Sequence, residues 1–283
     1  MSEKRLRLQY EGEFAYLRGD FARVIECFRE LGDDDAAKLR ACPLTIAAAI
    51  SFKDYPLYRE IETYLKGVVQ ANSCGDVTAV AELALNTAYV SAIAPNMVSD
   101  WLKNGGFSAL PILAKPDAAY KRAKYFQSLG NFEAMLAVAQ TALSLCEPAR
   151  GITYVGIYFC TTCAAACCGL KHMDEAERYL RDALNIALPH GFITPFAETV
   201  TAYGGLLEQL LEREYPAYYD AVTKQWKRTF KNWIAFHNQF TRDNITSILS
   251  LRDYQMAQLA ARGASNAEIA KRFHVSLGRP RSL

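Results

Sequence analysis

Three segments of the chain repeat one pattern, and this repetition constrains the fold more than any other feature. Each has a helical run with a small residue, a turn pair, an apolar residue directly after the pair, and a second amphipathic run. The turn pairs are Gly19-Asp20, Gly130-Asn131 and Lys171-His172, with a weaker copy through Lys53-Asp54-Tyr55. Glycine tolerates positive φ and ends a helix well. Since alternating strand patterns are nearly absent, the sequence predicts an all-α stack of helical hairpins.

The proline and glycine content divides this array. Pro95 to Pro116 holds three prolines and two glycines, which predicts a loop or break, with Trp101 and Phe107 as candidates for the rim of a binding face. Ala217 to Asn238 reads as an amphipathic capping helix whose basic stripe faces solvent. The expected organisation is a repeat block over 1–94, an irregular loop or break over 95–116, a second block with the capping helix over 117–238, a linker over 239–248 and a C-terminal motif over 249–283.

The hairpin pattern resembles the tetratricopeptide repeat, which has Gly or Ala, then Gly, then Tyr or Phe, then Ala at matching spacings. The first copy departs from that pattern with Val24 and Leu31, where the family prefers Ala. The resemblance implies an α-solenoid, a curved array whose concave face binds an effector or a partner protein.

The C-terminal motif carries the most specific local signals. Two capping boxes lie close together, one at Ser250 and Asp253 and the other at Ser265 and Glu268, with the helix stop Gly263 between them. Two short helices joined by a tight turn are the front of a helix-turn-helix. The residues expected to build this scaffold are Ser250, Asp253, Gly263, Ser265, Glu268, Ile269 and Ala270.

This stretch resembles the LuxR-type DNA-binding domain, whose pattern includes Leu-Ala-x-Gly-x-Ser-Asn-x-Glu-Ile-Ala. Leu259 to Ala270 matches it closely. With the repeats, the resemblance implies a transcriptional regulator akin to the maltose-regulon activator class, without its ATPase module, because no phosphate-binding Gly-x-x-x-x-Gly-Lys-Ser/Thr loop is present.

The residues after Ser276 depart from that family. Gly278 and Pro280 oppose a helix where the recognition helix would follow, so we expect a truncated helix-turn-helix that does not read a specific operator. Contacts to DNA are then limited to weak phosphate binding. The candidates for these contacts are Arg262, Lys271, Arg272, Arg279 and Arg281.

Charge and composition agree with this assignment. The net charge of +2 separates into a basic segment over 249–283, with six Lys/Arg and two Asp/Glu, and a slightly acidic remainder. No secretory signal or membrane-spanning run is apparent, which predicts a cytoplasmic protein with reduced cysteines and no membrane partner. Cys160, Cys163 and Cys167 fall in a row along one helix face, which suits packing better than metal binding.

The sequence thus favours a transcriptional regulator whose repeat region senses an effector or partner and whose C-terminal motif, when complete, binds DNA. The alternative is a scaffold that binds a peptide or protein in its concave groove, with a vestigial C-terminal motif. We expect no enzyme and no cofactor, because no catalytic or metal-binding motif appears. Homodimerisation is left open.

Overall fold

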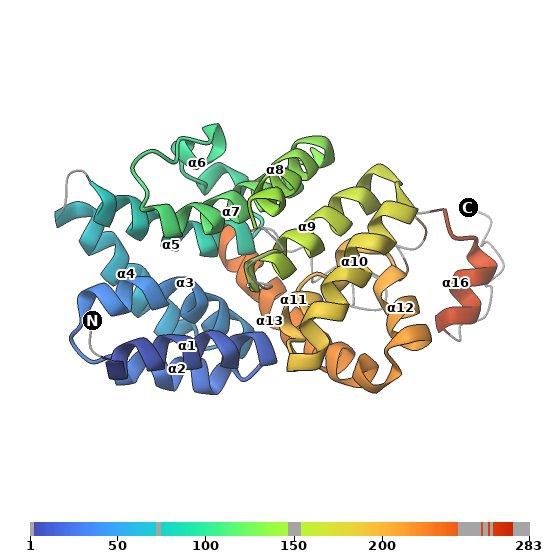
Figure 1. The fold of residues 1–283 in the computed structure, drawn as a ribbon, viewed down its shortest axis with the longest axis horizontal. Coiled ribbons are helices and arrows are strands. Elements are labelled where there is room, and N and C mark those ends of the chain that lie inside the picture. The colour runs from blue at the N-terminus through green and yellow to red at the C-terminus, as the bar shows by residue number, and fades with distance from the viewer. Residues whose placement is uncertain are drawn as a thin grey trace.

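The computed structural model describes residues 3–71, 75–146, 154–242 and 263–273, together with Met256 and Ala260. Within these residues the chain is all-helical and contains no strand, which confirms the predicted all-α class (Figure 1). The helices of the first part are α1 (Glu3–Arg18), α2 (Phe21–Glu30), α3 (Asp35–Phe52), α4 (Tyr55–Ala71) and α5 (Asp76–Ser91). Those of the second part are α7 (Lys115–Ser128), α8 (Phe132–Leu145), α9 (Tyr154–Leu170), α10 (Met173–Ala187), α11 (Thr194–Ala197), α12 (Leu206–Glu214), α13 (Pro216–Thr241) and α16 (Asn266–Phe273).

The predicted hairpin turns share one set of backbone hydrogen bonds. After α1, the N–H of Gly19 donates to the carbonyl of Tyr16, and the N–H of Asp20 donates to that of Ala15. Gly19 has φ of +79°, so both bonds form through a left-handed residue at the helix end. The same pair of bonds closes the turns at Lys53, Gly130 and Lys171. The weaker copy predicted at Lys53-Asp54-Tyr55 is therefore a helical hairpin as well.

The array of helices closes on itself instead of staying an open curve. Neighbouring helices pack against one another from α1 through α5 and from α7 through α10, while α5 contacts α7. Helix α1, at the start of the array, also contacts α11. Figure 1 shows α1–α5 on one side, α9–α12 on the other, and α13 running between them.

Helix α13 ties the two sides together because its two ends belong to different hydrophobic cores. Val222 and Trp226 pack in the core built by α7–α12, whereas Phe236 packs in the core of α1–α5. The ring of Phe236 lies edge-to-face on Tyr58, with centroids 4.9 Å apart. The basic stripe of Lys224, Lys227, Arg228 and Lys231 is exposed, as its helical spacing predicts.

Between α5 and α7 the chain forms only short helices, η1 (Pro95–Met97), α6 (Asp100–Asn104) and η2 (Ile112–Ala114). The proposed rim position of Trp101 and Phe107 is wrong. These two rings pack against each other around the buried Leu102, and the indole N–H of Trp101 donates to the Glu82 carboxylate. Both rings are half-buried, as is Glu82, and they pack against a core of α5, α6 and α7 residues.

Candidate functional site

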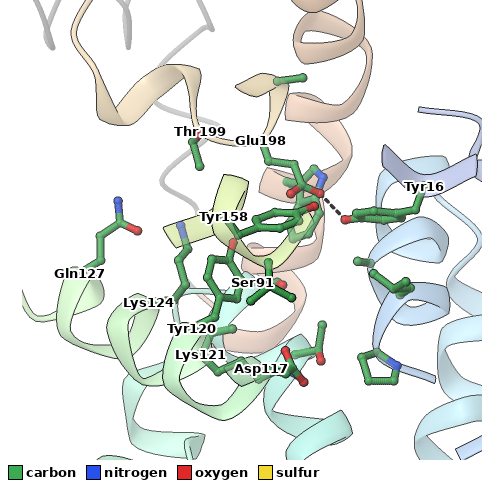
Figure 2. Close-up of a pocket in the computed structure, with 18 of the residues that line it drawn as sticks. Tyr16, Ser91, Asp117, Tyr120, Lys121, Lys124, Gln127, Tyr158, Glu198 and Thr199 are labelled. Carbon is green, nitrogen blue, oxygen red and sulfur yellow. Dashed lines mark hydrogen bonds and ion pairs between the residues drawn. The ribbon is translucent and has the colours of Figure 1, made fainter. Parts of the chain in front are cut away.

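The closed array surrounds a chamber of about 2320 Å³, larger than the ~300–1,000 Å³ usual for small-ligand pockets. Its wall combines residues from α1, α3, α7, α9, α11 and α13, so both halves of the chain contribute. Most of the wall is apolar and aromatic. Polar side chains gather on one part of it (Figure 2), and these are the candidate binding site.

Glu198 lies at the centre of this polar group, directly after α11. Its carboxylate accepts a hydrogen bond from the hydroxyl of Tyr16 on α1, the contact drawn as a dashed line in Figure 2. Burial raises the pKa of Glu198 to about 7, although the Tyr16 bond and the charge of Lys124 act in the opposite direction. A carboxyl with this pKa exchanges its proton in the physiological range, which is common at functional sites.

Helix α7 supplies the basic groups of the site. Lys121 and Lys124 lie on successive positions of its chamber face, together with Tyr120. Lys121 is buried and forms an ion pair with Asp117, so its charge is compensated. Lys124 forms no hydrogen bond or ion pair with any described residue, and only Glu198 attracts it electrostatically. Burial accordingly lowers the pKa of Lys124.

Two phenols complete the group. The rings of Tyr120 and Tyr158 meet edge-to-face with centroids 5.2 Å apart, and Figure 2 shows both beside Glu198. Burial raises the pKa of Tyr120 and of Tyr16, so both phenols keep their protons and act as donors. Besides the Lys121–Asp117 ion pair, the site therefore presents phenol hydroxyls, the ammonium of Lys124 and the titratable carboxyl of Glu198 to the chamber.

The same residues form the seam where the array closes. The hydroxyl of Thr194 on α11 donates to the backbone carbonyl of Tyr16, and the amide of Gln225 on α13 donates to that hydroxyl at 2.9 Å. The seam is tight, because a Cβ added at Gly19 would lie 2.2 Å from the Gln225 side-chain oxygen. Tyr16 and Glu198 thus serve the chamber and the seam at once.

The cysteine row of α9 has no comparable chemistry. Cys160, Cys163 and Cys167 are buried, and burial raises the pKa of Cys160 and Cys167 to about 11 and that of Cys163 higher still. The three thiols stay protonated at neutral pH and pack like small apolar side chains. Across the described part of the chain, no three His, Cys, Asp or Glu side chains come together to hold a metal ion.

The second capping box of the C-terminal motif is formed. The Glu268 N–H donates to the Ser265 hydroxyl at 3.3 Å, and the Ser265 N–H donates back to the Glu268 carboxylate at 2.8 Å. Gly263 has φ of +88°, and Ile269 and Ala270 are buried. Gly263, Glu268 and Ile269 also belong to the lining of the chamber.

Of the predicted phosphate contacts, only the Lys271 side chain can be placed, and it is exposed on α16. The first capping box and the remaining basic side chains lie outside the described residues. These are Ser250, Asp253, Arg262, Arg279 and Arg281, together with the side chain of Arg272.

Sequence reasoning did not single out the chamber site. Tyr16, the α7 pair Tyr120 and Lys124, Tyr158 and Glu198 come from four separate parts of the chain, and no single motif contains them. A usable signal was Glu198, the one charged residue within the otherwise uncharged stretch Phe192–Ala202. Such a carboxyl in an uncharged run needs a partner or a function.

No protein family, curated protein or solved structure matches this chain. The resemblances to tetratricopeptide repeats and to LuxR-type domains therefore remain predictions. None of the described helices combines the length and apolar character that crossing a bilayer requires.

Proposed function

We propose that this chain is a transcriptional regulator in which the closed helical array binds an effector and the C-terminal segment contacts DNA. The observation that carries the proposal is the polar group inside the chamber, where Lys124 and Glu198 sit among phenol hydroxyls. Charged side chains in an apolar chamber are unfavourable for folding unless they meet a partner, and this cost is typical of binding sites.

The position of the C-terminal motif supports a link between effector and DNA. Glu268 and Ile269 of α16 belong to the lining of the same chamber, so the segment that resembles the LuxR-type domain shares a wall with the candidate site. A ligand alters DNA binding only if it favours one arrangement of the two parts over another. The scaffold alternative is less favoured, because α1 meets α11 and closes the open groove that a long peptide would need.

The first test is a thermal-shift screen of small metabolites on the full chain. A true effector raises the melting temperature of the wild type, and the shift becomes smaller in Tyr158→Phe, which removes one chamber hydroxyl. Tyr125→Phe is the matched control, since Tyr125 lies on α7 outside the chamber lining. Hits that stabilise all three proteins equally would bind elsewhere and would not support the chamber as the site.

The second test measures coupling to DNA. Fluorescence anisotropy would follow binding to the gene's own upstream duplex and to a scrambled duplex, with and without the hit, at low and moderate salt. We expect salt-sensitive binding, with Kd of ~10⁻⁴–10⁻⁶ M at physiological salt, that changes with effector. Unchanged affinity would refute the link. A preference above about a hundredfold for the upstream duplex would reveal base-specific reading and would refute the prediction of a missing recognition helix.

A further inference from the structure

We infer that the chamber binds a small carboxylic acid with an apolar body, whose carboxylate is held by the ammonium of Lys124. The inference rests on the proposed effector function and names the chemical class of the effector. It is drawn from the unsatisfied donors of the chamber wall, from the balance of charges around them and from the apolar character of the remaining wall.

Three polar groups of the wall that lack a partner among the described residues can donate a hydrogen bond. Lys124 has no hydrogen bond or ion pair among the described residues, and burial lowers its pKa. Trp226, only 4% exposed, has an indole N–H with no hydrogen-bond partner among them, and the hydroxyl of Thr87 is likewise unpaired. An indole N–H and an ammonium can only donate, so the ligand that satisfies them carries acceptors. A carboxylate provides several acceptor sites and forms the stronger, charge-assisted bonds with an ammonium.

Most acidic groups of the wall accept a hydrogen bond or lie beside a cation, whereas Asp76 accepts only from the neighbouring Val77 N–H and Lys124 has only the attraction of Glu198. Asp117 pairs with Lys121, Asp35 accepts from Tyr64, Glu268 accepts from Ser265, and the charge of Arg40 acts on Glu13. Glu198 accepts from Tyr16 and is largely protonated below pH 7. A cationic ligand would meet an uncompensated ammonium here, whereas an anion compensates it.

The rest of the wall suits an apolar body. Aromatic and aliphatic side chains from both halves of the array line the chamber, including Phe28, Phe159, Phe230 and Trp233. Ile93 and Leu113 line it as well and are 57% and 80% exposed. Burial of an apolar ligand against these side chains supplies affinity, and the carboxylate fixes its orientation.

The experiment uses three probes with one apolar body and different head groups: 4-phenylbutyrate, 4-phenylbutyramide and 4-phenylbutylamine. Calorimetric titrations of the full chain at pH 6 would compare wild type with Lys124→Met and Lys115→Met. Lys115 opens the same helix but lies outside the chamber lining, so its replacement removes the same charge without changing the site. We expect the carboxylate to bind about tenfold or more tightly than the amide and the amine. That preference disappears in Lys124→Met and persists in Lys115→Met, as loss of a charge-assisted bond predicts.

A pH series distinguishes this arrangement from a general attraction of anions. The groups facing Glu198 are Tyr16 from α1, Lys124 and Tyr120 from α7, and Tyr158 from α9. A bound carboxylate favours the protonated form of Glu198, so its affinity falls between pH 6 and pH 8 as Glu198 ionises. Glu198→Gln, which stays neutral, should keep the pH 6 affinity at pH 8.

Several results would overturn the inference. They are tighter binding of the amine, equal binding of all three probes, no binding of any probe at millimolar concentration, or a carboxylate preference that survives Lys124→Met. Tighter binding of the amine would leave the effector proposal intact and change only the ligand class. If the carboxylate binds as expected but never alters DNA affinity, the regulator proposal fails while the assignment of the ligand class stands.

Discussion

Replacement of Glu198 by Gln should abolish a distinctive pH dependence of stability. The pKa of this carboxyl is 4.5 when exposed to solvent and about 7 in the fold, so the folded protein holds its proton more tightly than the unfolded chain. The contribution of Glu198 to the free energy of unfolding is therefore fully present below pH 4.5. It is lost as the pH rises through 7. Each pH unit between the two values is worth about 1.4 kcal/mol, which gives about 3 kcal/mol in total, or about 2 kcal/mol after allowance for residual contact with solvent.

Urea unfolding of wild type and Glu198→Gln at several pH values between about 5 and 8 measures this difference. Because the amide can still accept the bond from Tyr16, the two proteins should be similar at pH 5. At pH 8 the variant should be more stable by about 2–3 kcal/mol, which is the charge-burial cost that it no longer carries. Glu133→Gln on the exposed face of α8 is the control and should follow the wild type at every pH. If the free energy of unfolding changed with pH in the same way for wild type and Glu198→Gln, Glu198 would not be a buried, titrating carboxyl.

Two further changes test the packing of the array, and a third tests the cost of the Lys124 charge. Phe236→Ala removes the ring that anchors α13 in the core of α1–α5 and should lower the free energy of unfolding by about 3–5 kcal/mol, as measured by chemical denaturation. Phe52→Ala, at an exposed position, is the control and should lower it by about 0.5 kcal/mol or less. In the same assay, Gly19→Ala should destabilise the protein more than Gly32→Ala. Both glycines have positive φ, but only a Cβ at Gly19 would meet another side chain, the Gln225 oxygen of α13 at 2.2 Å. Lys124→Met should stabilise the protein at pH 6 by about 1 kcal/mol, because it removes a poorly compensated ammonium from the chamber. A lower melting temperature of the variant would show that the Lys124 ammonium is well compensated in the fold.

The local structure could be predicted because its causes lie within short stretches of sequence. The turns at Gly19, Gly130 and Lys171 depend on a left-handed residue followed by a helix start, and both features are visible in a few consecutive residues. The long amphipathic helix expected over 217–238 exists as α13 because its apolar spacing is regular.

The closure of the array and the chamber site could not be predicted in the same way. Their determinants are contacts between residues about 180 positions apart, such as the bond of Tyr16 to Glu198 and that of Thr194 to the Tyr16 carbonyl. No periodicity links α1 to α11, so the sequence favoured an open concave face. The rim position predicted for Trp101 and Phe107 failed for a similar reason. The composition of 95–116 indicates a break in the array, but it does not show against which helices the Trp101 ring packs.

The location of the chamber site gives the proposed regulator a simple physical means of response. Tyr16 belongs to the first helix of the array and Glu198 follows α11, so their hydrogen bond spans the seam and faces the chamber. In the proposed complex, an anion at Lys124 would favour the protonated form of Glu198, and a neutral carboxyl accepts a weaker hydrogen bond from Tyr16 than a carboxylate does. Because Gln225 of α13 joins the same seam through Thr194, any change there acts directly on the helix that connects both hydrophobic cores. If the proposed effector binds at Lys124, its site and the contact that closes the array have Glu198 in common.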